Sequence, residues 1–422
     1  MTPTTPHEAP GFAGLGIGEN FLRVLTQAKY TTPTPIQRQS IPAAIEGKDL
    51  IGIAQTGTGK TLAFGIPMIQ RLAVHKGQGL VVVPTRELAL QVEETLRKVG
   101  TPLGLRTAVI IGGESMGKQK NLLQGRPHII IATPGRFNDH LEQRNLTLNL
   151  VKILVLDEAD RMFDMGFAPQ INKILKVLPQ DRQTLLFSAT MPAEISKIAT
   201  SHMKLPLRIE VAPAGTAAQT VEQEMFIIKK EDKIRLLEKI LAEFPDTVLV
   251  FSRTKFGAKK ITQNIEKMGH KAAEIHSNKS LAQRIKALEG FKSGKFKVLV
   301  ATDIAARGID VKNIGLVINY DLPDNSEDYV HRIGRTGRAG SVGKAISFAT
   351  PDQRHDIQSI ERLIRKSLKI SPVPQDLPER KVMASDTRPP RQHQMAPRPK
   401  NNSYPGFRER RQRAFSQRRY SK

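Results

Sequence analysis

Short apolar runs alternate with helix-like patterns along most of the chain. From Asp49 to about Val211, runs rich in β-branched residues are bounded by turn or polar residues, and segments such as Arg86–Val99 and Ala193–Ser201 have helical periodicity. The apolar runs are DLIGIA, GLVVVP, TAVIIGG, HIIIATP, KILVLDEAD and TLLFSAT. This alternation predicts an α/β domain, a parallel sheet covered by helices on both faces.

The alternation stops at APAGTAAQT and then starts again. That segment is small, polar and aperiodic, which predicts a linker. Beyond it, the strand candidates are TVLVFSRT, KAAEIHS, KVLVATD, IGLVINYD and KAISFATP, and the helix candidates are Lys233–Phe244, Lys255–Met268 and Leu281–Lys292. The expected organisation is an N-terminal segment (1–48), a first α/β domain (49–211), a linker (212–220), a second α/β domain (221–369) and a tail (370–422).

The tail differs in composition from the rest of the chain. From Arg380 onward it has 13 Lys and Arg against 2 Asp and Glu, a net charge of +11, and prolines interrupt any helical pattern. This composition predicts a disordered basic segment. Its aromatic residues, Tyr404, Phe407, Phe415 and Tyr420, lie among arginines, a combination that suits single-stranded RNA through phosphate attraction and base stacking. A merely solubilising tail is the alternative.

The charge of the whole chain points the same way. The 422 residues include 65 Lys and Arg against 40 Asp and Glu, a net charge of +25. A polyanionic partner, nucleic acid above all, is expected, although an anionic membrane surface or a generally basic enzyme would also fit. The absence of cysteine excludes disulfides and thiolate metal sites. No apolar run reaches the roughly 20 residues that span a bilayer, and no signal peptide is visible, so we expect a cytoplasmic protein without a membrane partner.

The octet AQTGTGKT, which begins at Ala54, resembles a phosphate-binding loop. It lies between a predicted strand and a predicted helix, and it departs from G-x-x-x-x-G-K-[ST] only at Ala54. Gly57 and Gly59 would let backbone N–H groups face an anion, next to the positive end of the helix dipole. Lys60 would reach the β- and γ-phosphates and Thr61 would ligate Mg²⁺. A plain glycine-rich turn is the alternative.

A second acidic motif follows the apolar run ILVL. Asp157 and Glu158 stand at the carboxyl end of a buried strand, where ligands bind in open α/β sheets. Asp157 can hold Mg²⁺, through water, and Glu158 can orient the attacking water, as phosphoryl transfer to water requires. A polar turn after a strand is the alternative, and it becomes weaker if Lys60 shares the same sheet edge.

A third basic motif, YVHRIGRTGR, lies in the second domain. His331, Arg335 and Arg338 have the spacing of one face of a short helix or turn. Closely spaced arginines can offset negative charge in a triphosphate transition state. Taken alone, this motif favours a basic surface patch, and a role at the triphosphate requires that the second domain close on the first.

With these motifs the chain resembles the DEAD-box RNA helicases, and among them the bacterial cold-shock and ribosome-assembly type. The resemblance runs from about Phe12 to about Thr350 and covers KYTTPTPIQ, AQTGTGKT, PTRELA, Gly112–Gly113, TPGR, DEAD, SAT, VFSRT, Gln283–Arg284, ATDIAARGID and HRIGRTGR in order. It implies two tandem RecA-like domains with a cleft between them, which ATP and single-stranded RNA close together. The family usually has glycine where Lys29 stands.

The resemblance also implies site residues. Gln37 would read the adenine edge, with Phe12 and Tyr30 shaping the pocket, and Asp310 would contact the ribose. ATP would be bound by Phe12, Tyr30, Gln37, Thr56, Gly57, Thr58, Gly59, Lys60, Thr61 and Asp310. The catalytic set would be Lys60, Asp157, Glu158, Arg335 and Arg338, the last two as arginine fingers, with Mg²⁺ at Thr61 and Asp157.

The implied RNA contacts come from both domains and reach mainly the sugar–phosphate backbone. They are Thr85, Arg86, Gly113, Thr133, Gly135, Arg136, Arg253, Thr254, Arg284, Thr302 and Asp303. Ser188, Thr190 and His331 would couple the ATP and RNA sites.

The implied function is an ATP-dependent RNA helicase that locally opens short duplexes or remodels RNA–protein complexes. Its partners would be single-stranded RNA and short duplexes, in ribosomal precursors or with the RNA-decay machinery. Two alternatives are an ATP-dependent RNA clamp or annealing factor and a DNA translocase. PTPIQ and DEAD argue against the translocase.

Overall fold

The computed structural model describes residues 11–55, 57–211, 221–306, 311, 314–337 and 343–379. Residues up to Pro378 form one compact unit. Several predicted features lie outside the described residues: the linker at 212–220, the tail from Arg380, and the site residues Thr56, Asp310 and Arg338.

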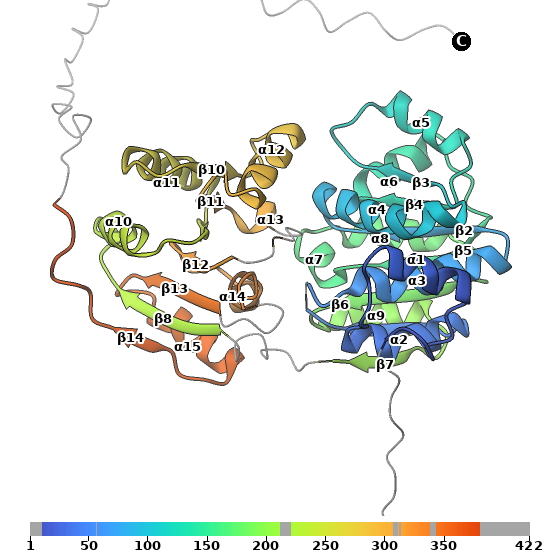
Figure 1. The fold of residues 1–422 in the computed structure, drawn as a ribbon, viewed down its shortest axis with the longest axis horizontal. Coiled ribbons are helices and arrows are strands. Elements are labelled where there is room, and N and C mark those ends of the chain that lie inside the picture. Colours follow the sequence, from blue (N-terminus) through green and yellow to red (C-terminus); the bar gives the residue numbers. More distant parts are fainter. Residues whose placement is uncertain are drawn as a thin grey trace, which may run out of the picture. The chain divides into compact units, whose positions relative to one another are not determined.

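The first domain is built on a parallel sheet of seven strands within the described residues (Figure 1). Its strands are β1 (Leu50–Ile53), β2 (Gln78–Val82), β3 (Thr107–Ile110), β4 (Ile129–Ala132), β5 (Val151–Leu156), β6 (Gln183–Ser188) and β7 (Leu207–Glu210). Its helices are α1 (Glu19–Gln27), α2 (Pro35–Ile45), α3 (Lys60–Val74), α4 (Arg86–Gly100), the short 3₁₀ helix η1 (Thr101–Leu103), α5 (Met116–Gln124), α6 (Pro134–Glu142), α7 (Ala159–Asp164), α8 (Ala168–Val177) and α9 (Ala193–His202).

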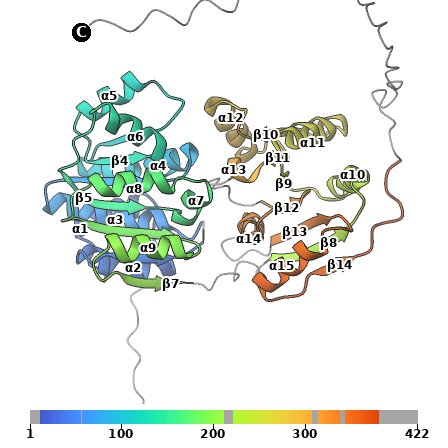
Figure 2. The same cartoon turned by 180° about the vertical axis from the view of Figure 1, so that it is seen from behind.

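Helices cover both faces of this sheet, which Figures 1 and 2 show from opposite sides. Side chains from α1 to α4 form one apolar cluster with alternate strand residues such as Val81 and Val155. Side chains from α6 to α9 form a second cluster with the intervening residues, such as Leu80 and Leu154. Because successive side chains of a strand point to opposite faces, fully apolar strands supply both clusters at once.

The second domain has its own parallel sheet of seven strands within the described residues. Its strands are β8 (Val221–Ile227), β9 (Val248–Phe251), β10 (Ala272–Ile275), β11 (Val298–Ala301), β12 (Leu316–Asn319), β13 (Gly343–Ala349) and β14 (Lys369–Ser371). Its helices are α10 (Lys233–Glu243), α11 (Lys255–Lys267), α12 (Leu281–Lys292), α13 (Asp303–Ala306), α14 (Ser326–Ile333) and α15 (Arg354–Ile364). Helices α10 and α11 pack on one face, and α12, α14 and α15 pack on the other.

The two domains share one strand order. The first sheet runs β3-β4-β2-β5-β6-β1-β7 and the second runs β10-β11-β9-β12-β13-β8-β14. When each domain is numbered from its own first strand, both orders read 3-4-2-5-6-1-7. The predicted fold class, two parallel α/β domains in tandem, is therefore confirmed, and the second domain repeats the topology of the first.

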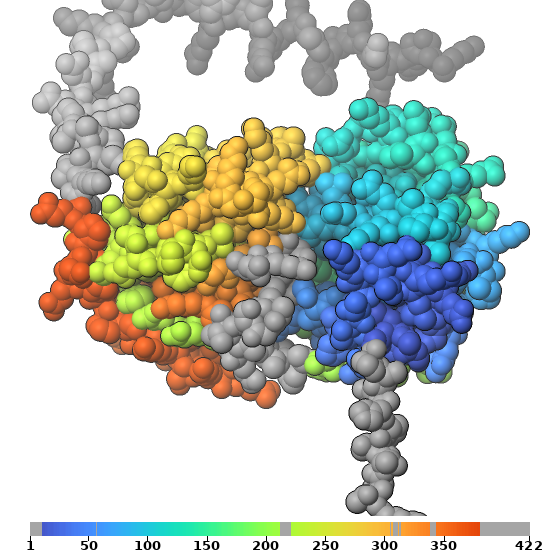
Figure 3. Space-filling model, in the orientation of Figure 1, coloured from blue at the N-terminus to red at the C-terminus, as the bar shows by residue number. Residues whose placement is uncertain are grey.

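The N-terminal segment packs on the first domain, where its dark blue residues form part of the domain surface (Figure 3). Gln70 of α3 accepts a hydrogen bond from the Gly18 N–H and donates one to the Gly16 carbonyl. Lys29, two residues after the end of α1, has φ +63°, and the N–H of Tyr30 donates to the carbonyl of Leu25. A left-handed residue at this position explains why glycine is the common choice there.

Three strands were not predicted from the pattern: β7, β8 and β14. β7 and β14 are short edge strands with mostly exposed side chains, so they have little apolar signal. β14 pairs with β8 from Lys369, the residue at which the sequence places the end of the second domain. The chain stays attached beyond it, because Arg235 Nε donates to the Pro378 carbonyl at 2.6 Å and Lys239 pairs with Asp376 at 2.7 Å.

The five expected helices are present, each ending within one residue of its expected position. Across the described residues, no helix combines the length and the apolar character needed to cross a membrane.

Candidate functional site

The loop between β1 and α3 has the backbone shape that its glycines allow. Gly57 has φ +86° and Gly59, directly before α3, has φ +91°. Both values lie in the left-handed region that glycine adopts at low cost. A Cβ on Gly59 would also lie 2.4 Å from Gln37 Nε2, so a side chain at this position would collide with α2.

Lys60 is the first residue of α3, and its side chain is buried within the loop. Its Nζ donates to the Ala54 carbonyl at 3.0 Å and lies 3.9 Å from Asp157 Oδ1. Thr58 closes the turn by donating to the Gln55 carbonyl at 2.7 Å, and Thr61 follows Lys60 at the start of the helix. The structure therefore brings Lys60 and Asp157, which are distant in sequence, to the same edge of the first sheet.

Gln37 connects the N-terminal segment to this loop. Its Nε2 donates to the Gly59 carbonyl at 2.9 Å, and its Oε1 accepts from the N–H of Thr34 at 2.9 Å, where it helps to cap α2. An amide carries two N–H groups and two carbonyl lone pairs, so these two bonds do not exhaust it. The structure thus gives Gln37 a direct contact with the loop, and recognition of adenine by it stays a prediction.

Phe12 and Tyr30, the other predicted adenine-pocket residues, both pack against the apolar cluster of α1 to α4. Phe12 is buried, whereas Tyr30 is half-buried with Lys98 Nζ 4.9 Å from the centre of its ring. Burial and the nearby Glu94 raise the pKa of the Tyr30 hydroxyl. Both side chains therefore attach the N-terminal segment to the first domain.

Asp157 follows β5, and its carboxylate is buried. Burial raises the pKa of Asp157 to about 6, while the Lys60 ammonium acts in the opposite direction. The N–H of Glu158 donates to Asp157 Oδ1 at 2.9 Å. A buried carboxylate beside a lysine is an arrangement that a bound cation and phosphate groups can stabilise further.

Glu158 is held by Arg161, an arginine outside the predicted site residues. Arg161 Nη1 donates to Glu158 Oε2 at 3.1 Å, and both residues are 2% exposed. Glu158 has φ +53°, an uncommon conformation for a residue with a side chain. The left-handed turn directs the chain into α7, so that Glu158 and Arg161 meet across one helical turn.

Asp160, the last residue of the DEAD motif, fixes the same turn to the end of β6. Its Oδ2 accepts hydrogen bonds from the N–H of Ala189 at 3.0 Å and from the N–H and hydroxyl of Thr190 at 2.9 and 3.2 Å. The hydroxyl of Ser188 in turn accepts from the N–H of Asp160. The predicted coupling residues Ser188 and Thr190 therefore contact the acidic motif directly.

The predicted RNA contacts of the first domain gather after β2, β3 and β4, which are neighbours in the sheet. A Cβ on Gly113 would lie 2.3 Å from Arg86 Nη1, so the glycine leaves room for that guanidinium. Arg136 Nη1 donates to the Glu114 carbonyl at 2.8 Å. Thr85 caps α4, Thr133 precedes α6, and Gly135 lies in its first turn.

In the second domain, Asp303 pairs with Arg332. Arg332 donates to both of its carboxylate oxygens, from Nε at 2.5 Å and from Nη2 at 2.6 Å. Arg332 also donates to Asn319 Oδ1 and to the Asp321 carbonyl, and its guanidinium lies 5.0 Å from the ring centre of Phe251. Asp303 is thus the counter-ion of a buried arginine. Its contact with RNA stays a prediction.

Two of the other predicted residues of the second domain have local contacts, and a third contacts the first domain. Arg253 pairs with Asp324 at 3.2 Å, Thr254 caps α11, and Thr302 follows β11. Arg284 Nη2 lies 3.1 Å from Glu87 Oε2, and both side chains are mostly buried. Arg284, expected to bind RNA, therefore meets a carboxylate of α4 in this structure.

The arginine motif lies at the end of α14. His331 is in the last turn of the helix, and Arg335, 3% exposed, follows it and donates from Nε to the His331 carbonyl at 3.3 Å. A cavity of about 10 Å³, room for about one water, is lined by Arg161, Phe251, Asp303, Ala306, Asp328, His331, Arg332 and Arg335. The arginine beside Glu158 and the predicted finger Arg335 thus border one small space.

Periodicity could have identified Arg332, since it falls on the helix face of the buried residues Tyr329 and Ile333. Arg161 stands three residues after the predicted catalytic Glu158, and this spacing is the only sequence signal for their contact. Its burial could not be predicted, because a helix of six residues is too short to show a periodic apolar face.

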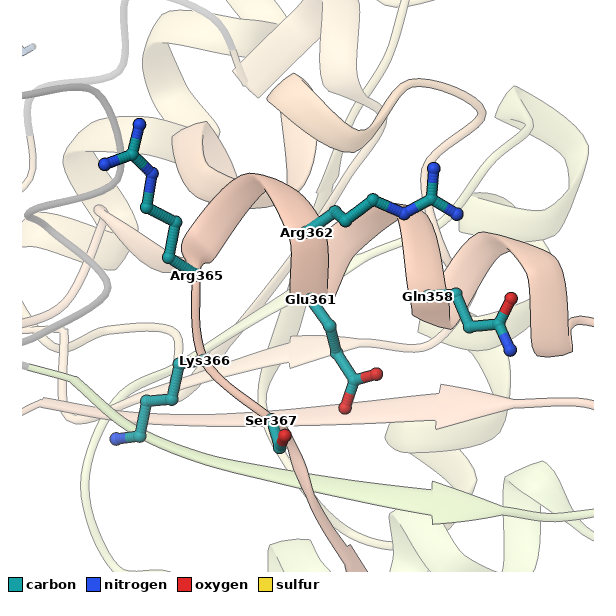
Figure 4. Close-up of a pocket in the computed structure, with 6 residues that line it drawn as sticks. All are labelled: Gln358, Glu361, Arg362, Arg365, Lys366 and Ser367. Atoms are coloured by element: carbon teal, nitrogen blue, oxygen red, sulfur yellow. The ribbon is translucent and has the colours of Figure 1, made fainter.

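A separate hollow of about 420 Å³ contains none of the predicted site residues. It is lined by Gln358, Glu361, Arg362, Arg365, Lys366 and Ser367 at the carboxyl end of α15 (Figure 4). Cations are favoured at that end of a helix, and Glu361 Oε1 accepts from the N–H of Leu368, so these residues stabilise the helix end.

Comparisons with known proteins point to one family. Residues 34–198 match the DEAD/DEAH box helicase family model, and residues 232–340 match the model of the helicase conserved C-terminal domain. The chain is 43% identical over 356 residues to the ATP-dependent RNA helicase DbpA of Bacillus subtilis, over 84% of this chain and 74% of that protein.

A second relative is the ATP-dependent rRNA helicase RRP3 of Debaryomyces hansenii, 42% identical over 378 residues, which are 89% of this chain and 79% of that protein. Among solved structures, S. cerevisiae Dbp5 bound to RNA and ADP BeF3 is similar with a TM-score of 0.78 and 30% identity, over 87% of this chain and 96% of that chain.

Proposed function

The chain belongs to the DEAD-box family of ATP-dependent RNA helicases, and on that premise we propose which of its residues bind ATP, hydrolyse it and grip RNA. Its activity is RNA-dependent hydrolysis of ATP coupled to RNA remodelling, on two RecA-like domains. The observation that carries the site assignment is the meeting of Lys60, Asp157 and Glu158 at the carboxyl edge of the first sheet.

The proposed ATP site uses the loop from Gln55 to Thr61. The N–H groups around Gly57 and Gly59 bind phosphate oxygens, and Lys60 exchanges its contact with the Ala54 carbonyl for the β- and γ-phosphates. Gln37 reads the adenine edge from beside the same loop. Thr56 and Asp310, which lie outside the described residues, are assigned to the ATP site from their positions in the sequence motifs.

Mg²⁺ fits the proposed site because the donors are hard oxygens, the Thr61 hydroxyl and the buried Asp157 carboxylate. Among the described residues, no group of three or more His, Cys, Asp or Glu could hold a metal, which agrees with a cation that takes phosphate and water oxygens as well. When bound, Mg²⁺ neutralises phosphate charge.

Glu158 is the proposed residue that orients and polarises the attacking water. Arg161 keeps its carboxylate in one position, and Asp160 fixes the turn to β6. Arg335, together with Arg338, offsets the charge that develops on the transferred phosphoryl group. Because Glu158 and Arg335 belong to different domains, the complete site depends on both, which makes hydrolysis responsive to RNA bound across them.

The proposed RNA surface uses Arg86, Gly113 and Arg136 in the first domain and Arg253, Thr254 and Thr302 in the second. Such contacts reach mainly the sugar–phosphate backbone, which positions RNA without reading its sequence. Bending of one strand then opens a short duplex locally. The basic tail adds affinity, and ribosomal RNA precursors are the proposed substrate, as the name of the RRP3 relative suggests. The cysteine-free composition supports the cytoplasm as the proposed location.

Steady-state ATPase assays with and without single-stranded RNA test this function, with Lys60→Ala as the site control. We expect stimulation by RNA, little stimulation by DNA of the same sequence, and weak ATP binding in Lys60→Ala. Opening of a short RNA duplex by a chain ending at Pro378 separates a helicase from a clamp. ATPase activity without duplex opening would favour the clamp, and equal stimulation by double-stranded DNA would favour a translocase.

A further inference from the structure

One exposed aromatic ring lies beside the proposed RNA surface of the second domain. Phe256 is 72% exposed, and the other large hydrophobic side chains that are exposed in the described part of the chain are aliphatic. A single exposed hydrophobic residue is common and needs no explanation by itself. The position of Phe256, two residues after Thr254 and three after Arg253, is what gives it meaning.

The backbone that carries Phe256 is fixed. Phe256 lies in the first turn of α11, which Thr254 caps by accepting from the Gly257 N–H at 2.9 Å. A Cβ on Gly257 would lie 2.6 Å from the Ser252 hydroxyl, so the glycine lets this turn pack tightly against the end of β9. Because the backbone of this turn is already fixed, binding to the exposed ring would cost little conformational entropy.

The surroundings of the ring are basic. Lys255 Nζ lies 5.3 Å from the ring centre and donates to Asn278 Oδ1 at 3.1 Å, which links the start of α11 to the loop that follows β10. Lys259 and Lys260, both exposed, stand three and four residues after Phe256 and so share its side of α11. An aromatic face among cations is complementary to a nucleotide, which has a flat base and a negative phosphate.

We propose that Phe256 is a stacking platform for one nucleobase of bound single-stranded RNA, with Lys255, Lys259 and Lys260 binding the adjoining phosphates. The proposal rests on the proposed RNA surface and adds a base contact to a grip that otherwise reaches the backbone. Every base has an aromatic face, so this contact tolerates any sequence and favours the larger purines through stacking strength alone.

The chain contains no tryptophan, so Phe256→Trp places the only tryptophan, which can be excited selectively over the tyrosines, at the proposed platform. The full-length variant is titrated with a single-stranded RNA decamer and with an abasic ribose–phosphate chain of equal length, in the presence of Mg²⁺ and a non-hydrolysable ATP analogue. We expect saturable quenching by the RNA and none by the abasic chain. Ile370→Trp, on an exposed residue of β14 in the same domain, is the matched control and should show no quenching with either.

Affinity gives a second readout. Phe256→Ala should raise the Kd for the RNA decamer about fivefold or more, because stacking of one base on an aromatic ring contributes about 1–3 kcal/mol. The Kd for the abasic chain and the salt dependence of RNA binding should not change, since no charge is removed. Lys259→Ala should instead reduce the salt dependence. Phe256→Tyr should restore the affinity.

Equal quenching by RNA and abasic chains, or an equal loss of affinity for both in Phe256→Ala, would overturn the stacking contact. Failure of the proposed function has a different signature, because the wild-type chain would then show neither RNA binding nor RNA-stimulated ATPase activity. If RNA stimulates the ATPase activity of the wild type but does not quench the fluorescence of Phe256→Trp, the stacking platform is rejected and the proposed function stands.

Discussion

The guanidinium of Arg161 donates a 3.1 Å hydrogen bond to the carboxylate of Glu158, and the two side chains are almost completely buried. Glu158 is the proposed water-orienting residue, so its position is set by an arginine one helical turn away. An ion pair in a buried site holds geometry strongly, because both charges have been removed from water and each is stabilised by the other.

Replacement of Arg161 is expected to slow hydrolysis without weakening ATP binding. Arg161→Met removes the donor that fixes Glu158, and misplacement of a catalytic group by about 1 Å costs on the order of 100-fold in rate. Single-turnover ATPase rates and ATP affinity, measured separately, check this. Arg161→Lys should recover part of the rate. A variant that hydrolyses ATP normally would show that Arg161 has no positioning role.

Glu158→Gln should retain bound ATP, prolong the lifetime of the RNA complex and reduce hydrolysis by about 10²–10⁴-fold, the usual contribution of general base catalysis. Nucleotide affinity and RNA dissociation rates measure the first two effects. The substitution also leaves Arg161 without its carboxylate. We therefore expect a lower Tm, which the double variant Glu158→Gln with Arg161→Met should partly restore while hydrolysis stays slow. Rapid turnover in Glu158→Gln would remove Glu158 from the mechanism.

Arg332 and Arg335 are three residues apart but should respond differently to substitution. Arg332→Met removes a buried guanidinium from its pair with the partly exposed Asp303, and we expect a loss of unfolding free energy of up to about 3 kcal/mol, the lower end of the cost of breaking a fully buried pair. Arg335→Met should mainly slow hydrolysis, because the guanidinium acts on the transition state. Denaturant unfolding and ATPase rates of the two variants distinguish these roles. If Arg335→Met lowered the unfolding free energy and Arg332→Met mainly slowed hydrolysis, the two arginines would have the opposite roles.

His140 is expected to make the first domain sensitive to acid. Its Nε2 lies 3.2 Å from Gln119 Oε1, and its Nδ1 lies 3.3 Å from Asn145 Nδ2, which fits a neutral ring that donates from Nε2 and accepts at Nδ1. Gln119 is held in this orientation by its own bond to the Ile111 carbonyl. Burial, and then the charge of Arg136, lower the pKa of His140, while Asp139 acts in the opposite direction.

Because the folded pKa of His140 is lower than the unfolded value, the unfolded chain binds more protons below about pH 6.5. The contribution of His140 to stability is therefore complete above that pH and is lost as the pH falls from there towards the folded pKa. Unfolding free energies between pH 5 and 7.5 should fall less steeply on acidification in His140→Gln than in the wild type. His75→Gln, at an exposed histidine, is the control and should follow the wild-type curve.

Removal of the residues after Pro378 should make RNA binding less dependent on salt. The residues from Arg380 carry a net charge of +11, and each phosphate that they neutralise releases counterions. The slope of log K against log salt measures the change. A shortened chain with the wild-type slope would show that the tail does not contact phosphate.

The apolar pattern was sufficient for the α/β architecture because interior parallel strands are apolar on both faces and stand out against amphipathic helices. β7 and β14 gave no such signal, since edge strands bury few side chains. The shared strand order of the two sheets was also unreadable, because periodicity shows which face of an element is buried but not which element it pairs with.

The sequence by itself determined the local chemistry: a glycine-rich turn before Lys60, carboxylates after a buried strand, and arginines at the end of a helix. Only the tertiary structure decided the partners. It put Lys60 beside Asp157, paired Asp303 with Arg332 and set Arg284 against Glu87. Spacing along one strand or helix is fixed by backbone geometry, whereas contacts between elements follow from how parallel crossovers bring strand ends to one edge.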